Sequence, residues 1–162
     1  MIESTAMERR TSRVAALLCF SLLCLPLTQD RVLSQSKAPA SRLPQLLEQS
    51  GYNYSKVSDN VWVIPFNGKI LKDFNVIITP QEGLAVIFVI VAQQKELKVT
   101  PELMRALLRM NADFDRVKVG IDKDGDLFVR VDASERVLDV EELKTNIEQV
   151  AAAADEVRKL AG

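Results

Sequence analysis

The sequence predicts an α+β fold in which three helices pack on a mainly antiparallel sheet of five strands, in the order α-β-β-β-α-β-β-α. The first observation is a run of nine apolar residues, Leu84–Ala92, which is rich in Val and Ile and follows a Gly turn. Such a run predicts a central strand that is covered on both faces. The second is that short alternating segments stand in groups between amphipathic helical segments. This order indicates strands joined by hairpins, with helices between the groups.

Composition limits the possible functions. The chain has 162 residues, of which 48% are hydrophobic, and this is enough for one domain with a sizeable core. Its 21 basic and 22 acidic residues give a net charge of −1. The chain therefore lacks the basic excess with which proteins bind nucleic acid, and we expect no nucleic-acid partner.

The N-terminal region has the pattern of a secretory signal. Arg9, Arg10 and Arg13 precede an apolar run at residues 14–27, which has the length of a signal peptide and is short for a membrane-spanning helix. Ser34 offers a small residue for cleavage before Gln35. We expect an exported protein, periplasmic or secreted, whose only contact with a membrane is this signal. An ordinary N-terminal helix is the alternative interpretation.

These boundaries divide the chain into a signal peptide at residues 1–34, a linker at 35–41 and one α+β domain at 42–162. Both cysteines, Cys19 and Cys24, lie inside the predicted signal. The mature chain would therefore contain no thiol in an oxidising compartment.

Residues 41–51 are predicted to form a short amphipathic helix. Ser41 is the predicted N-cap, Pro44 is tolerated in the first turn, and Gly51 follows the last turn at a position that favours glycine. The side chains that would face the sheet at helical spacing are Leu43, Leu46 and Leu47.

Two strands are predicted after this helix. Residues 52–57 are expected to be extended, and residues 58–60 turn the chain into the strand Val61–Phe66. Pro65 cannot donate a ladder hydrogen bond, so this strand is expected at an edge of the sheet or to end there. Residues 73–79 alternate, with three apolar side chains on one face: Phe74, Val76 and Ile78.

The second helix is predicted from Thr100, which suits an N-cap and is followed by Pro101, to Asn111. Met104 and Leu108 lie one turn apart, beside the stripe that would face the core. A surface helix normally keeps its opposite face polar, so these two residues are a candidate surface for a homodimer or another protein partner. The alternative is that another segment of the same chain covers them. The predicted core stripe is Leu103, Ala106, Leu107 and Met110.

Two more strands and the longest helix complete the chain. Residues 116–121 and 127–131 alternate, and Asp124-Gly125 between them is a strong hairpin signal. Asp139 and Glu142 have the spacing of a capping box at the start of the last helix. The side chains predicted to point inward are Val117, Val119, Ile121, Leu127, Val129 and Val131 in the strands, and Val140, Leu143, Ile147, Val150, Ala154 and Val157 in the helix.

Few residues of the sequence indicate catalysis or metal binding. The chain has no histidine, and the predicted mature domain has no cysteine, which excludes Ser-His-Asp and Cys-His catalysis and removes the commonest metal ligands. Asp122, Asp124 and Asp126 alternate as in a calcium loop. However, the sixth and twelfth positions, which require Gly and Glu in an EF-hand, hold Leu127 and Ala133. We expect no catalytic residue, no cofactor and no metal site.

Two other features admit a functional interpretation. Asp113 and Asp115 could pair as the acids of a small hydrolase, although solvation of a loop is the favoured interpretation. Trp62, with Tyr52 and Tyr54 near it in the sequence, could belong to an aromatic binding surface, although packing in the core or at an edge is favoured.

The residues Leu-Leu-Arg-Met-Asn at 107–111, the hairpin sequence DKDGDLFVRVD and a final helix carrying AAAADE resemble the YbjN-like family of bacterial sensory-transduction regulators. That family is similar in fold to the type III secretion chaperones. The resemblance covers about residues 43–160, and it implies a fold that binds other polypeptides, often as a homodimer and without enzyme activity.

We therefore expect an exported, non-catalytic module that binds a protein or peptide and that forms a homodimer. One alternative is a structural, envelope-associated protein without a specific ligand. The last alternative is a small carboxylate-based hydrolase, which would need paired acids inside a pocket.

Overall fold

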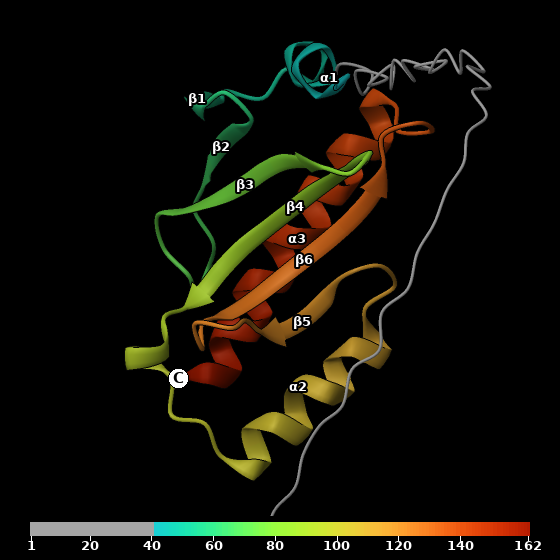
Figure 1. The fold of residues 1–162 in the computed structure, drawn as a ribbon. Helices are drawn as coiled ribbons and strands as arrows, with labels where there is room; N and C mark the ends of the chain where they lie inside the picture. The colour runs from blue at the N-terminus through green and yellow to red at the C-terminus, as the bar shows by residue number, and fades with distance from the viewer. Residues whose placement is uncertain (1–40) are drawn as a thin grey trace, which may run out of the picture. The chain divides into compact units, whose positions relative to one another are not determined.

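The computed structural model describes residues 41–162, so the predicted signal and all but the last residue of the predicted linker lie outside the described residues. The described residues form the predicted α+β fold, with one strand more than expected (Figure 1). The elements are α1 (Leu43–Ser50), β1 (Ser55–Ser58), β2 (Val61–Phe66), β3 (Phe74–Gln81), β4 (Leu84–Ala92), η1 (Gln94–Glu96), α2 (Pro101–Asp113), β5 (Lys118–Ile121), β6 (Leu127–Ser134) and α3 (Val140–Ala161).

The sheet has six antiparallel strands in the order β1-β2-β3-β4-β6-β5, so the prediction of five strands is wrong. The additional strand is β1, whose four residues are all exposed. The residues of β1 do not alternate between apolar and polar, so the sequence contains no pattern from which this strand could be predicted. It is a strand because it pairs with β2, a tertiary interaction that periodicity does not report.

Pro65 lies where β2 has a neighbour on one side only. β2 pairs with β3 from Trp62 to Phe66, with Pro65 opposite Asn75, whereas β1 reaches no further along β2 than Val63. β2 is thus an interior strand over its first half and has an open side at Pro65. β2 is not an edge strand, but it ends at Phe66, directly after Pro65, and this agrees with the predicted alternative that the strand ends there.

β4 is the central strand, as predicted, and α3 packs along one face of it (Figure 1). On this inner face the side chains of Ile87 and Val89 are buried, together with the inward residues that the alternation predicted on β3 and β6. These are Phe74, Val76 and Ile78 of β3, and Leu127, Val129 and Val131 of β6.

The outer face of the sheet, which is the face turned away from α1 and α3, carries no helix of the described residues (Figure 1). On this face Val86 of β4 is buried, whereas Phe88 and Ile90 are only half-buried. The prediction that β4 is covered on both faces is therefore wrong for the domain formed by residues 41–162. No helix of residues 41–162 lies over these outer side chains.

The start of α1 is held differently from the prediction. Arg42, not Ser41, occupies the N-cap, and its side chain makes no capping hydrogen bond. The Ser41 hydroxyl donates to the carboxylate of Glu135 at 2.8 Å and accepts from the Leu43 N–H at 3.2 Å. At the other end Gly51 has φ +77°, in the left-handed region that favours glycine, as predicted.

The capping box predicted for α3 is half formed. The side chain of Asp139 accepts from the Glu142 N–H at 2.8 Å. The Glu142 carboxylate does not return to the Asp139 backbone but binds the guanidinium of Arg116. A residue far away in the sequence has thus taken over one partner of a local motif.

Candidate functional site

α2 is a peripheral helix, and most of its apolar side chains are incompletely covered. Of its thirteen residues only Leu107 is buried. Met104 is half-buried against the core, whereas Leu108 is 66% exposed. The structure thus places the two candidate surface residues differently, with Leu108 open to solvent and Met104 at the border of the core.

The position of α2 is fixed at both ends. The hydroxyl of Thr100 accepts from the Leu103 N–H at 3.1 Å, which confirms the predicted N-cap. The helix runs two residues beyond its predicted end at Asn111. Asn111 itself bonds to β5, since its Oδ1 accepts from the Val119 N–H at 2.8 Å and its Nδ2 donates to the Val119 carbonyl at 3.0 Å.

A shallow apolar groove of about 220 Å³ lies on the outer face of the sheet. Its floor is formed by side chains from β4 and β6, among them Phe88, Ile90 and Phe128. Asp122 and Arg130 stand at its rim as charged groups of opposite sign. An apolar floor with a polar rim is the composition of surfaces that bind other proteins.

Gly120 allows the ring of Phe128 to lie in this groove. The two residues are opposite each other in the β5–β6 ladder, and a Cβ atom at Gly120 would lie 2.8 Å from Cζ of the Phe128 ring. A side chain at this position would push the ring away. The glycine therefore shapes the end of the groove that lies towards the edge strand.

The acidic residues that suggested a hydrolase are not assembled as a catalytic pair. Asp113 and Asp115 are both exposed at the end of α2 and in the loop that follows. A glycosidase-like acid pair requires at least one carboxyl group in a desolvated position. These two residues do not meet that requirement.

The acids of the β5–β6 hairpin organise the backbone of the turn. The Asp122 carboxylate accepts from the N–H groups of Asp124 and Asp126, each at 2.9 Å. The Asp126 carboxylate accepts from the Gln94 N–H at 2.8 Å and so joins the hairpin to η1. Asp124 points to Lys123. Each carboxylate thus has a partner within the fold.

Within residues 41–162, no group of three or more acidic side chains is placed to hold a metal ion. In the same part of the chain, none of the helices has the length and apolar character required to cross a bilayer.

The aromatic residues of the N-terminal half belong to the core and its border. Trp62 is buried, as the favoured interpretation predicted. The Tyr52 ring lies 6.1 Å from the Phe66 ring, and its hydroxyl donates to Glu148 at 3.1 Å. Burial, followed by the bond to this carboxylate, raises the pKa of Tyr52 to about 12. This tyrosine therefore anchors the segment after α1 to α3.

The apolar groove was missed by sequence reasoning, although the sequence contains a signal for it. Alternate positions of β4 are apolar on both faces, while only one helix-covered face exists. The outward positions therefore indicate a surface that some other molecule can cover.

The order of elements and the sheet order define a class: an α+β domain with the fold found in components of type III secretion complexes and in YbjN. One chain of the heterodimeric ExoU–SpcU complex from the type III secretion system of Pseudomonas aeruginosa matches with a TM-score of 0.54 at 18% identity. This match covers 72% of the present chain and 95% of that chain. One chain of the ExsC–ExsE complex matches with a TM-score of 0.56 at 13% identity, over 74% and 93% of the two chains.

The crystal structure of YbjN from E. coli matches with a TM-score of 0.53 at 18% identity, over 72% of this chain and 89% of that chain. The model of the YbjN family, described as "Putative bacterial sensory transduction regulator", matches residues 39–160. The chain belongs to the YbjN family, and the resemblance noted in its sequence is confirmed. No curated protein matches the sequence. At these identities the structural likeness concerns the fold.

Proposed function

We propose that this protein is an exported, non-catalytic module that binds another protein and that associates with a second copy of itself through α2. The observation that carries the proposal is the apolar surface that no element of residues 41–162 covers. It comprises the outer-face groove around Phe88 and Phe128 and the exposed side of α2 at Leu108. Exposed apolar patches of this kind mark sites of protein association.

The comparisons support a protein partner. Two of the structures with the same fold are complexes, ExoU–SpcU and ExsC–ExsE. A fold alone is a weak argument for function, because one fold serves many roles. The uncovered groove adds an argument that belongs to this chain, since its floor is apolar and its rim carries Asp122 and Arg130.

For self-association, α2 offers the most suitable surface. Leu108 is exposed and Met104 is half-buried one turn away, so the pair presents an apolar strip on a helix that packs on the domain only along its other side. In a two-fold dimer such a strip meets its own copy.

Affinity purification of the full-length chain from its native envelope fraction tests the partner proposal. We expect a partner in stoichiometric amount that is retained by the wild type and lost from the Phe88→Lys variant. Val57→Lys is the matched control, because Val57 is an exposed apolar residue on the edge strand β1, 65% exposed. Recovery of no partner from any fraction would favour a structural protein without a specific ligand.

A further inference from the structure

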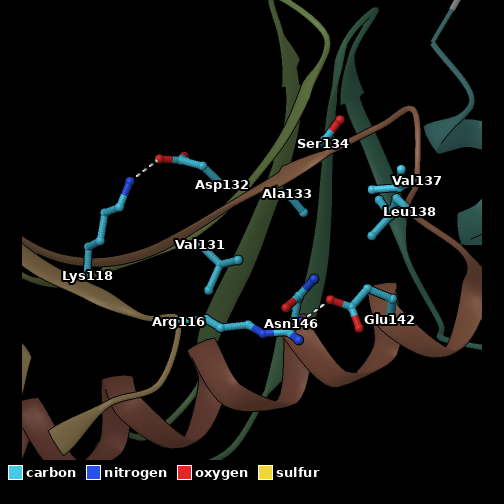
Figure 2. Close-up of a pocket in the computed structure, with 10 residues that line it drawn as sticks. All are labelled: Arg116, Lys118, Val131, Asp132, Ala133, Ser134, Val137, Leu138, Glu142 and Asn146. Atoms are coloured by element: carbon cyan, nitrogen blue, oxygen red, sulfur yellow. Dashed lines mark hydrogen bonds and ion pairs between the residues drawn. The ribbon is translucent and has the colours of Figure 1, made fainter.

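A second hollow, of about 360 Å³, lies between the end of β6 and the first turns of α3 (Figure 2). We call it the β6 hollow. Its volume lies within the range of about 300–1,000 Å³ that is typical of ligand sites. The side chains that matter for its chemistry are Arg116, Lys118, Asp132, Val137, Glu142 and Asn146.

One wall of the β6 hollow is the unpaired side of a strand. β5 pairs with β6 only from Leu127 to Arg130, where Lys118 is the last partner. β6 continues to Ser134 and keeps β4 as its neighbour on the other side. From Val131 onward the side of β6 that faces the hollow therefore has no strand partner, and Figure 1 shows β6 running on past β5. An open strand edge is a template for another strand.

The floor of the hollow contains a buried carboxamide without a hydrogen-bond partner. Asn146 is only 1% exposed, and neither its Oδ1 nor its Nδ2 is bonded. It stands on α3 within the apolar stripe of Leu143, Ile147 and Val150. Figure 2 shows it projecting from α3 towards β6. A buried polar group without a partner is rare in native proteins, and each one requires an explanation.

The charged groups of the hollow are already paired with one another. Arg116 binds Glu142, and the Lys118 ammonium lies 2.8 Å from the Asp132 carboxylate (Figure 2). Arg130 also binds the Asp132 carboxylate, so both carboxylates of the hollow are already paired and neither is free to hold a metal ion. The Ser134 carbonyl at the end of the strand edge already accepts from the N–H groups of Val137 and Leu138. What remains is neutral: the amide donor and acceptor of Asn146 and the edge groups of β6 before that carbonyl.

The ligand that offers a neutral donor and acceptor at every unit is a polypeptide backbone. The same domain shows how a carboxamide engages such a backbone. Asn111 bonds both the N–H and the carbonyl of Val119 on the outer edge of β5. Asn146 has the same two groups and no such partner.

We propose that the β6 hollow binds an extended segment of another polypeptide, which adds a short strand beside residues 131–134 and is hydrogen-bonded by Asn146. This inference rests on the proposed function, since it gives the protein partner a second point of contact besides the outer-face groove. Four strand residues span about 13 Å, which limits the paired part to a short motif. Val137, which lines the hollow and is 75% exposed, supplies an apolar contact for its side chains.

The test uses the full-length chain and a phage-displayed library of random twelve-residue peptides as the probe. We expect selected peptides that are neutral and rich in strand-forming residues. Asn146→Leu, which keeps the branching at Cγ but removes both hydrogen-bonding groups, should weaken their binding about tenfold or more. In ¹⁵N-resolved NMR spectra the side-chain NH₂ signals of Asn146 should shift when peptide is added.

Gln149→Leu is the matched control. Gln149 is a carboxamide on the same helix whose buried Oε1 also lacks a partner, but it lines a different hollow, beside Asp113 and Phe114. Its replacement should leave peptide binding unchanged. Peptides that bind equally well to wild type and Asn146→Leu would overturn the proposed docking site while leaving the protein-binding function intact. Selection of no peptide, together with a partner recovered by affinity purification, would also overturn it.

One further variant tests whether the β6 hollow is occupied by another protein or by the N-terminal segment of the same chain. Ser41, the first residue that the structure describes, is held by Glu135, next to Ser134 at the end of β6. In the full-length chain, residues 35–40 are replaced by Gly and Ser. If peptides bind only to this variant, the occupant is the chain's own segment and the proposal is wrong. Equal binding to the wild type supports it.

Discussion

The carboxamide of Asn111 on α2 hydrogen-bonds both backbone polar groups of Val119 on β5, at 2.8 Å to the N–H and 3.0 Å to the carbonyl oxygen. β5 is the last strand of the sheet, so these backbone groups would otherwise lie at an open edge. The side chain thus joins α2 to the sheet and also blocks strand addition at this position of the edge. The open side of β6 beyond β5 has no such bond from Asn146.

Replacement of Asn111 by Leu should lower the free energy of unfolding by about 1–3 kcal/mol, because two backbone groups lose their partner. Chemical denaturation monitored by circular dichroism measures the change. Arg109→Leu, an exposed substitution on the same helix, should leave the midpoint nearly unchanged. Equal midpoints for Asn111→Leu and wild type would show that the bonds add no net stability.

Asp155 on α3 fixes the loop between β2 and β3, and this contact should depend on pH. Its carboxylate accepts from the Ile70 and Leu71 N–H groups at 2.7 and 2.8 Å. Desolvation acts against the shift, but the backbone hydrogen bonds from Leu71 and Ile70 outweigh it and lower the pKa of Asp155 below 3.8. A carboxyl group whose folded pKa is depressed stabilises the fold above its unfolded pKa. This contribution is lost as the pH falls through the folded pKa.

We therefore expect wild type to exceed Asp155→Asn in unfolding midpoint at pH 7, and the difference to shrink in the acid range below about pH 4. Urea denaturation of both proteins at pH 7 and pH 3 measures this. Gly68→Ala is a second variant for the same contact, since a Cβ there would collide with the Asp155 carboxylate. A difference that stays constant with pH would mean that the carboxylate charge is not involved.

The combined variant Met104→Glu and Leu108→Glu should convert the proposed dimer into a folded monomer, because like charges would face each other across the two-fold axis. Light scattering of wild type and variant, with circular dichroism as the check on folding, measures both properties. A wild type that is monomeric at high protein concentration contradicts the dimer. An unfolded variant would indicate that Met104, which is half-buried, belongs mainly to the core.

If the protein is exported, its mature N-terminus can be predicted. If residues 1–34 are a signal peptide, the protein isolated from its native source should begin at Gln35 or a near neighbour. Mass spectrometry of the intact protein determines this. A chain that retains Met1 or Met7 in the cytoplasmic fraction would contradict export.

Much of the fold could be predicted because its elements carry local signals. The apolar run of β4, the alternation of β3 and β6, and the caps at Thr100 and Asp139 are patterns of neighbouring residues, and each is found where it was expected. The family resemblance also rests on short local stretches. The candidate residues Met104 and Leu108 were identified in this way, as apolar positions beyond those that the helix needs for packing.

By itself, then, the sequence determined which segments are strands and helices wherever apolar periodicity or a cap marks them. Only the tertiary structure decided that the exposed segment β1 pairs with β2 and that one face of β4 has no helix over it. It also decided that the Asn111 carboxamide hydrogen-bonds Val119, whereas the Asn146 carboxamide has no hydrogen-bond partner. The physical reason is that periodicity reports how one residue is oriented relative to its neighbours in the same element. Hydrogen-bond pairing and coverage depend on which distant elements come together, and two asparagines on helices look alike until their surroundings are known.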